Sequence, residues 1–499
     1  MIDPALVGAS PGPTTMVWSL FDRQRTAFAL APHPSLATRR AALRRLRDAI
    51  RRHAPRCAEA ASADFGMRSS GETLMVDLLP ALLHIDHLLR HLRRWMRPSR
   101  RRTELLFRTN RAWVEYQPKG VVGIVVPWNF PFYLALGPLA TALAAGNRCL
   151  IKTSEYAPHS ATALRALLGD ALSDDVVAVV EGGVECAKQF CALPFNHLVF
   201  TGSPEVGRQV MRAAAEHLTP VTLELGGKSP ALVSRSADLA TAARRIVHGK
   251  ITNAGQVCVA PDYALVPREH MGEFVAAAVG AIRKLVNDGS QYTSMIDARA
   301  YERMNQLLDD ARALGAQVIP CACQSNGMHD ARQFLPHIVT GVTPQMRIAR
   351  EEIFGPILPI VAYESFDEAL DHIQRGPRPL ALYWFGKDRL EQQRVLLETH
   401  AGGVTLNDWG WHALNHDLPF GGTGTSGMGN YHGEEGFREL SHAKAVFAEH
   451  RWFPVELFHP PYGGVVQRAV LRWYFGAGAT APLPGTQAQP ARSASGTGA

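Results

Sequence analysis

The sequence has few cysteines and no long hydrophobic run. Its seven cysteines are an odd number scattered over 499 residues without a Cys-x-x-Cys pair, so neither a disulfide framework nor a zinc site is indicated. No stretch reaches the roughly 18 uninterrupted apolar residues of a membrane span, and the N-terminus lacks an apolar run of signal length. These absences predict a cytoplasmic protein in a reducing compartment, with no membrane contact and no metal site.

A dominant charge of one sign is also missing. Lys and Arg number 52 against 45 Asp and Glu, which gives a formal net charge of +7. The excess gathers in HLLRHLRRWMRPSRRR, where Arg90, Arg93, Arg94 and Arg97 recur at helical spacing. No known nucleic-acid-binding module follows, so a solvated helix face is favoured and no nucleic-acid partner is expected.

The hydrophobic pattern indicates an α/β protein. A first amphipathic helix has Leu43, Leu46, Ile50 and Cys57 on one face, and from Gly120 short β-rich runs alternate with helical segments. The β-rich runs are hydrophobic throughout, which is typical of parallel strands buried on both faces. We therefore expect a doubly wound parallel sheet, with functional groups at the C-terminal ends of its strands, and a second α/β region, because the chain is too long for one core.

Two stretches that follow β-rich runs offer groups for a dinucleotide. FTGSPEVG places Gly202 and Gly207 between a strand and a helix, where free amides hold phosphates, although tight turns also need glycine. Lys152, Ser154 and Glu155 close the run RCLIK, where a carboxylate accepts hydrogen bonds from ribose hydroxyls and favours NAD over NADP. An exposed ion pair explains Lys152 and Glu155 equally well.

Three further residues suggest covalent chemistry on a carbonyl group. Cys258 ends the polar run TNAGQVC, and Glu224 opens ELGGKSP 34 residues earlier (258 − 224). A thiol that attacks a carbonyl and a carboxylate that activates water are the groups that an enzyme needs to oxidise an aldehyde through a thioester, with a bound cofactor as hydride acceptor. Asn129 in PWNFP offers an amide for an oxyanion. Taken singly, the cysteine also fits a buried core position and the asparagine a turn.

Seven ordered runs carry a resemblance to the aldehyde dehydrogenase superfamily. The resemblance spans about Phe21 to Trp452, and the runs HLRRWMRPSRRR, VEYQP and GMGNYHGEEGF are most similar to the coniferyl aldehyde dehydrogenase branch, which is related to the class three enzymes. The seven runs are PWNFP (127–131), KTSE (152–155), FTGSPEVG (200–207), ELGGKSP (224–230), NAGQVC (253–258), EEIFGP (351–356) and LPFGG (418–422).

The resemblance implies a role for each motif residue. Cys258 would be the nucleophile, Glu224 the base that activates water, and Asn129, with the Cys258 backbone amide, the oxyanion hole. Glu352 would hold the nicotinamide ribose and Lys152 with Glu155 the adenosine ribose. The cofactor-binding residues would be Trp128, Lys152, Ser154, Glu155, Gly202, Ser203, Gly207, Leu225, Glu352 and Phe354.

The resemblance also implies the domain organisation. The expected parts are an NAD(P)-binding domain at 1–99 and 118–225, a catalytic domain at 226–416, a bridging and oligomerisation element at 100–117 and 436–460, and a disordered tail at 476–499. The bridging element would make the protein a homodimer or a homotetramer.

The expected reaction is oxidation of an aldehyde to the carboxylic acid with NAD, or with NADP. The substrate would be aromatic, such as coniferaldehyde, or a medium-chain aliphatic aldehyde. One alternative is a relative that passes the thioester to coenzyme A, against which Glu224 argues; another is a catalytically silent structural or binding protein, against which the complete set of catalytic residues argues.

Some residues depart from the family pattern. Thr153, Val257 and Thr423 replace the usual proline, threonine and valine, and the first lies beside the ribose-binding residues, which leaves the choice between NAD and NADP open. Trp409 and Trp411 precede LPFGG in a loop that borders the family's substrate tunnel. Either an indole shapes the tunnel for flat aromatic aldehydes, or both pack between loop and core.

Overall fold

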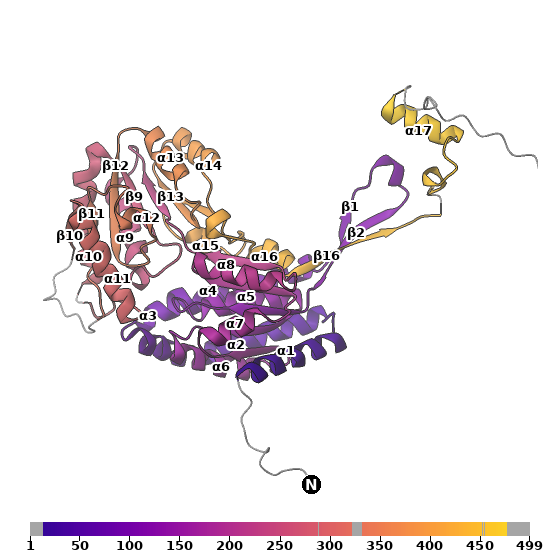
Figure 1. The fold of residues 1–499 in the computed structure, drawn as a ribbon, viewed down its shortest axis with the longest axis horizontal. Helices are drawn as coiled ribbons and strands as arrows, with labels where there is room; N and C mark the ends of the chain where they lie inside the picture. Colours follow the sequence, from indigo (N-terminus) through magenta and orange to yellow (C-terminus); the bar gives the residue numbers. More distant parts are fainter. Residues whose placement is uncertain (1–12, 288, 322–331, 452, 454, 477–499) are drawn as a thin grey trace, which may run out of the picture. The chain divides into compact units, whose positions relative to one another are not determined.

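The structure is a computed structural model that describes residues 13–287, 289–321, 332–451, 453 and 455–476 (Figure 1). The predicted disordered tail at 476–499 lies, except for Gly476, outside the described residues. Over those described ranges, no helix combines the length and the apolar character needed to cross a membrane. The cytoplasmic location stays a prediction.

The chain forms two compact units. One contains the chain up to Arg97 and from Glu115 to Lys444, and the other contains Pro98–Val114 and the described part of the chain after Ala445. The first unit holds two large sheets and every residue proposed for chemistry.

The first large sheet has six strands in the order β15-β7-β6-β3-β4-β5. All neighbouring pairs are parallel except β15 with β7, whose register places Gly427 opposite Glu224. The strands are β3 (Val121–Val125), β4 (Arg148–Lys152), β5 (Val177–Val180), β6 (His197–Gly202), β7 (Val221–Leu225) and β15 (Gly427–Met428).

Helices cover both faces of this sheet. Neighbouring residues on one strand point to opposite faces and therefore pack in different cores. Val122 and Ile124 of β3 pack in one core, whereas Val121 packs in another with Phe190 and Val210. Burial on both faces explains the continuous hydrophobic runs. The first core takes α2 (Leu36–Phe65), α4 (Leu79–Trp95), α5 (Tyr133–Ala145) and α6 (Pro158–Ala171); the second takes α1 (Pro13–Leu30), α7 (Val184–Cys191) and α8 (Pro204–Ala215).

The second large sheet has seven strands in the order β10-β11-β12-β9-β8-β13-β14, parallel except for β10 with β11. Its strands are β8 (Pro230–Val233), β9 (Tyr263–Pro267), β10 (Gln317–Pro320), β11 (His337–Thr340), β12 (Ile357–Tyr363), β13 (Ala381–Phe385) and β14 (Gly403–Leu406). The helices around it are α9 (Leu239–Ile251), α10 (Met271–Val286), α11 (Ala298–Ala313), α12 (Arg347–Arg350), α13 (Phe366–Arg375), α14 (Arg389–Glu398) and α15 (Trp411–Leu414). The predicted α/β class with doubly wound parallel sheets is confirmed.

A third, three-stranded sheet has the order β1-β2-β16, formed by Ser99–Arg101, Arg111–Pro118 and Ser441–Ala448. Within the second unit, the Phe107 ring lies 5.6 Å from that of Phe453 and 6.0 Å from that of Phe447. The unit ends in α17 (Val465–Phe475). The boundaries expected for the three functional domains stay predictions.

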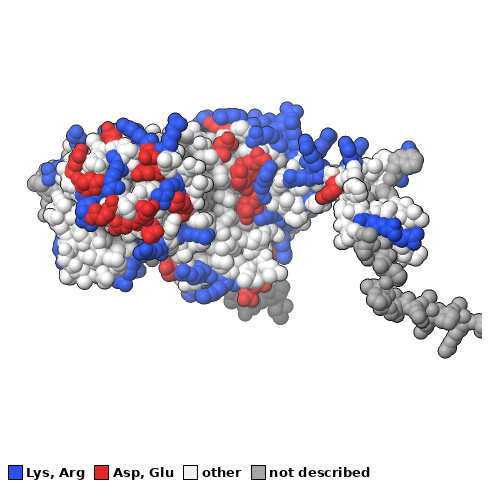
Figure 2. Space-filling view, turned by 90° about the horizontal axis from the view of Figure 1, so that it is seen from above, with Lys and Arg blue, Asp and Glu red and all other residues white. Residues whose placement is uncertain are grey.

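The arginine-rich segment forms the end of α4 and the turn after it. Arg90, Arg93, Arg94 and Arg97 are all exposed, as predicted for a solvated helix face. One of them, Arg94, contacts Glu434 at 3.2 Å. Over much of the face seen in Figure 2, basic and acidic side chains lie beside one another.

Candidate active site

Cys258 lies where two cavities of the first unit meet. Among the cysteines that the structure describes, it alone is not buried. Its side chain lines an apolar cavity of about 440 Å³, and it also lines a polar cleft of about 750 Å³. A reactant in either space therefore reaches the same sulfur.

The turn before Cys258 has an unusual backbone. Asn253, Ala254 and Gly255 have φ values of 49°, 51° and 73°, in the left-handed region that costs a residue with a side chain about 1 kcal/mol or more. At Gly255 a Cβ atom would lie 2.3 Å from the Gly355 carbonyl oxygen, so only glycine allows this approach. The turn brings the cysteine segment against the Glu351–Gly355 loop.

A buried polar network holds this turn in place. The Gln256 side-chain amide donates to the carbonyls of Asn253 (2.9 Å) and Ser294 (3.1 Å) and accepts from the Ile296 N–H (2.9 Å). The Glu72 carboxylate accepts the Asn253 backbone N–H at 2.5 Å. These positioning residues were not predicted from the sequence, where the only signal was the polar character of the run before the cysteine.

Asn129 follows β3 and is buried beside that network. Its side-chain amide donates to the Gln256 carbonyl at 3.1 Å, and its own carbonyl accepts from Arg68 at 3.2 Å and from the Asn253 amide at 3.1 Å. The buried Asp77 carboxylate lies 3.7 Å from Arg68. The amide of Asn129 is thus fixed at the edge of the polar cleft that Cys258 also lines.

Glu224 lies on β7, lines the same polar cleft, and is almost completely buried. Neither of its carboxyl oxygens has a hydrogen-bond partner among the described residues. Burial raises the pKa of Glu224 well above its usual range, because a carboxylate loses its water shell there. A group in this state takes up a proton readily and is free to bind a water molecule.

The charge around Cys258 opposes thiolate formation. Burial raises the pKa of the Cys258 thiol to about 12, and the carboxyl groups of Glu352 and Glu224 add to this effect. The backbone N–H groups of Cys258 and Val259 act in the opposite direction. The same two N–H groups face the sulfur, where they also suit an oxyanion on an attacked carbonyl carbon.

The polar cleft collects most of the residues predicted for the cofactor, namely Trp128, Gly202, Ser203, Leu225, Glu352 and Phe354. Ser203 caps α8, accepting the Val206 N–H at 3.4 Å, so the N-terminus of that helix borders the cleft. Free amides at a helix N-terminus attract anions such as a pyrophosphate.

The segment that carries Glu352 and Phe354 is held by hydrogen bonds to its backbone carbonyls. Arg303 donates to the carbonyls of Glu352 and Ile353, both at 2.6 Å. Burial, followed by the charge of Asp262, raises the pKa of Glu352 to about 8. The Phe354 ring stands edge-on to Trp128, with centroids 5.5 Å apart.

Four predicted cofactor residues do not line this cleft. Lys152 is buried and donates to the Thr153 and Gly182 carbonyls, both at 2.6 Å, so the alternative of an exposed ion pair is wrong for this residue. The Glu155 carboxylate lies 4.0 Å from the Lys152 ammonium group.

The other two residues of this group have local structural contacts. The Ser154 hydroxyl accepts the Tyr156 N–H at 3.2 Å. Gly207 allows close contact of α8 with β7, since a Cβ atom there would lie 2.8 Å from the Leu225 side chain.

Trp409 and Trp411 line the apolar cavity together with Cys258. The Trp409 indole N–H donates to His248 at 2.9 Å, and the ring packs over Gly249, where a Cβ atom would lie 2.6 Å from it. Trp411 is 58% exposed. Trp409 therefore combines both expected roles, as a cavity wall and as a packed ring, whereas Trp411 stands at the surface.

Comparison with known proteins identifies the family. The family model described as "Aldehyde dehydrogenase family" matches residues 15–446. The chain belongs to the aldehyde dehydrogenase family. It is 46% identical over 459 residues to "Probable coniferyl aldehyde dehydrogenase" of Pseudomonas aeruginosa, a match that covers 91% of this chain and 96% of that protein.

Solved aldehyde dehydrogenase structures agree with this assignment. The substrate-bound Staphylococcus aureus AldH has a TM-score of 0.85 and 34% identity, over 92% of this chain and 99% of that one. Mycobacterium tuberculosis aldehyde dehydrogenase complexed with NAD+ has a TM-score of 0.80 and 26% identity, over 88% and 91% of the chains. The predicted family and the enzyme class, an NAD(P)-dependent oxidoreductase that acts on an aldehyde, are confirmed.

The residues of the polar cleft suit a dinucleotide. The α8 N-terminus offers amides for the pyrophosphate, and Glu352 offers a carboxylate for ribose hydroxyls. The roles of the individual site residues stay predictions.

Proposed function

We propose that this chain oxidises an aromatic aldehyde, such as coniferaldehyde, to its carboxylic acid with NAD through a thioester on Cys258. The observation that supports the proposal most directly is the position of Cys258 on both cavities. The apolar cavity would take the aldehyde, and the polar cleft would take the nicotinamide end of the cofactor. The aldehyde and the nicotinamide would then both lie next to the Cys258 sulfur.

The residues would act in two stages. The thiol proton of Cys258 leaves to solvent and the resulting thiolate bonds to the aldehyde carbon, while the amide of Asn129 and the backbone N–H of Cys258 hold the oxyanion that forms. Bound NAD supplies the acceptor for the hydride that leaves this carbon. Glu224 then takes a proton from a water molecule, whose oxygen bonds to the thioester carbon; the C–S bond breaks and the acid leaves.

Within the cofactor, each group has a candidate partner. The α8 N-terminus at Ser203 would hold the pyrophosphate, Glu352 the nicotinamide ribose, and Glu155 the adenosine ribose. The Glu155 carboxylate would repel a 2′-phosphate, which supports NAD rather than NADP. Comparing NADH and NADPH formation in one assay tests this preference; equal kcat/KM values would contradict it.

The aromatic substrate is supported by the cavity walls and by the relatives. Phe130, Tyr133, Trp409 and Trp411 present flat rings around the space that leads to Cys258. The Pseudomonas aeruginosa relative is named for coniferyl aldehyde. The buried Glu224 beside the thiol supports release of a free acid rather than acyl transfer to coenzyme A.

The test measures kcat/KM for coniferaldehyde and for a medium-chain alkanal. In the Trp411→Ala variant the ratio of the two values should fall, because a stacking surface for the flat substrate is lost. Trp18→Ala removes a comparably exposed tryptophan on α1 and should leave the ratio unchanged. An unchanged ratio in both variants would show that Trp411 does not contribute to a preference for the aromatic aldehyde.

Product analysis with and without coenzyme A distinguishes acid release from acyl transfer.

The second unit supports a homodimer or a homotetramer. Its side chains Leu105, Phe447 and Phe458 are at least half exposed, which a solvated monomer has little reason to retain. We propose that segments 100–117 and 436–460 form the subunit contact. Light scattering during gel filtration measures the mass, and a monomer would contradict the proposal.

A further inference from the structure

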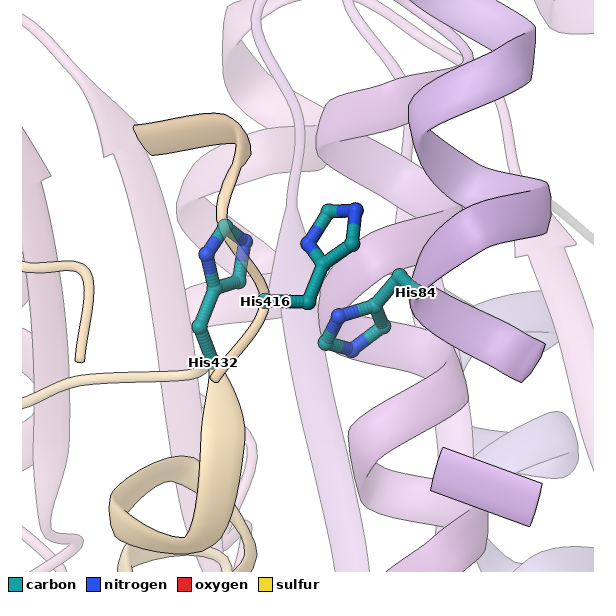
Figure 3. A group of neighbouring side chains, drawn as sticks. All are labelled: His84, His416 and His432. Atoms are coloured by element: carbon teal, nitrogen blue, oxygen red, sulfur yellow. The ribbon is translucent and has the colours of Figure 1, made fainter. Parts of the chain in front are cut away.

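Three buried histidines meet behind the active site, on segments distant in the sequence. His84 lies on α4, His416 follows α15, and His432 immediately precedes α16 (Gly433–Glu439). Figure 3 shows their rings gathered in one place. The ring centroids are 4.9 Å apart for His84 and His416, 5.1 Å for His84 and His432, and 5.3 Å for His416 and His432.

The hydrogen bonds of His84 leave one nitrogen lone pair free toward this group. The Thr141 hydroxyl donates its only hydrogen to the Tyr431 carbonyl at 2.8 Å, so it accepts from Nε2 of His84, also at 2.8 Å. The proton of the neutral imidazole is then on Nε2, and Nδ1 carries a lone pair. Nδ1 has no hydrogen-bond partner among the described residues.

The other two rings are placed in a comparable way. The Tyr133 hydroxyl lies 2.8 Å from Nε2 of His432, while Nδ1 of His432 has no partner in the described structure. Neither ring nitrogen of His416 makes a hydrogen bond of normal length and angle with any described residue. Buried polar atoms without partners are costly, and the cost disappears if they share one ligand.

We propose that His84, His416 and His432 bind a divalent transition-metal cation, with Zn²⁺ as the preferred ion. One nitrogen from each ring lies within 4.8 Å of the others. Zn–N bonds of about 2.0–2.1 Å in a tetrahedron place the nitrogens roughly 3.3 Å apart, so the rings would have to approach one another by up to about 1.5 Å when the ion binds. Three imidazoles without thiolate or carboxylate favour Zn²⁺ and its neighbours over Mg²⁺ or Ca²⁺.

The surroundings match those of a metal site in two further respects. The hydroxyls of Thr141 and Tyr133 each lie 2.8 Å from the Nε2 atom of one ring, and second-layer groups orient histidine ligands in this way. All three rings are also buried, so bulk water does not compete for their free nitrogens.

A bound ion would join three segments, two of which lie next to the cavity-lining residues Leu414 and Tyr431. It would tie α4 to the segments at His416 and His432, and Tyr133, which contacts His432, also lines the cavity with Cys258. The ion would therefore have a structural role, and it takes no part in the proposed reaction. Asp417, the residue after His416, is well exposed.

The experiment uses the full chain, stripped of metal with a chelator, and Co²⁺ as a visible probe for a Zn²⁺ site. Four proteins are compared: wild type, His416→Gln, the control His412→Gln, and Cys258→Ser. His412 is a buried histidine outside the cluster, and Cys258→Ser excludes binding at the active-site thiol. Bound metal per chain after gel filtration, the Co²⁺ absorption spectrum and the Tm with and without Zn²⁺ are recorded.

The expected result is one Co²⁺ per chain, with the intense visible bands of a four-coordinate ion, in wild type, His412→Gln and Cys258→Ser. Zn²⁺ should displace it and raise Tm by at least about 2 °C. His416→Gln breaks no ordinary hydrogen bond and should lose both the bands and the Tm shift. Absence of bound ion from the wild type overturns the proposal without any variant, and so do bands that persist in His416→Gln or vanish in Cys258→Ser.

Discussion

Replacing Gln256 by leucine tests whether the buried network positions the Cys258 thiol. Leucine has a similar volume but makes no hydrogen bond. The Asn253 carbonyl keeps the Gln256 backbone N–H as a donor (3.1 Å), whereas the Ser294 carbonyl and the Ile296 N–H lose the side chain that satisfies them. At about 1–3 kcal/mol for each buried unsatisfied group, the substitution should cost about 2–6 kcal/mol of stability.

The same substitution should lower activity by more than the stability loss alone explains. Without the amide, the turn with three left-handed residues loses part of its support, and the cysteine shifts. A displacement of 1 Å at a reacting group costs on the order of 100-fold in rate. We expect kcat/KM for coniferaldehyde to fall at least about 10-fold at a temperature where the variant remains folded.

Gln333→Leu is the matched control. Gln333 is also buried, and its side chain donates to the carbonyls of Gly289 (2.9 Å) and Tyr292 (2.6 Å), but it lines neither cavity. Both variants should lower Tm, and only Gln256→Leu should slow alkylation of Cys258 by iodoacetamide or lower kcat/KM. Equal activity of the two variants, whether intact or lost, would refute a positioning role for Gln256.

Three other predictions concern the reacting groups themselves. Asn129→Ala should lower kcat by about 100 to 1,000 fold while NAD binding, followed by fluorescence, stays intact; most of the turnover surviving would refute its oxyanion role. Because Glu352 raises the pKa of Cys258, Glu352→Gln should speed alkylation of the thiol at pH 9, and an unchanged rate would show that the two groups do not interact. Because burial raises the pKa of Glu224, its base form and the wild-type turnover should increase as the pH rises, whereas Glu224→Gln should give one burst of NADH and little turnover; sustained turnover points to another base.

The main parts of the fold and of the cleft follow from local sequence patterns. Continuous hydrophobic runs separated by helices predict parallel strands, and the ends of such strands meet at one edge. Asn129 after β3, Gly202 at the end of β6 and Glu224 in β7 lie where that rule expects functional groups, and they line one cleft. Cys258 comes from a different part of the chain, and its place in the cleft was expected from the family resemblance.

The supporting residues could not be predicted because their partners are far away in the chain. Glu72 contacts Asn253 across 181 positions, and Ser294 contacts Gln256 across 38. A buried glutamine or glutamate has no local pattern that distinguishes it from a solvated one. The histidine cluster is equally hidden, since no short ligand spacing links its members, and the expectation of no metal rested on such spacings alone.

The contact between Gly249 and the Trp409 ring makes one wall of the apolar cavity depend on a residue outside it. The ring is supported from α9 by a residue without a side chain, so the width of the apolar cavity depends partly on a position that does not line it. An added methyl group there would meet both the indole and the ring of Pro261, so the shape of the cavity can change through a residue of the scaffold rather than through a residue of its lining.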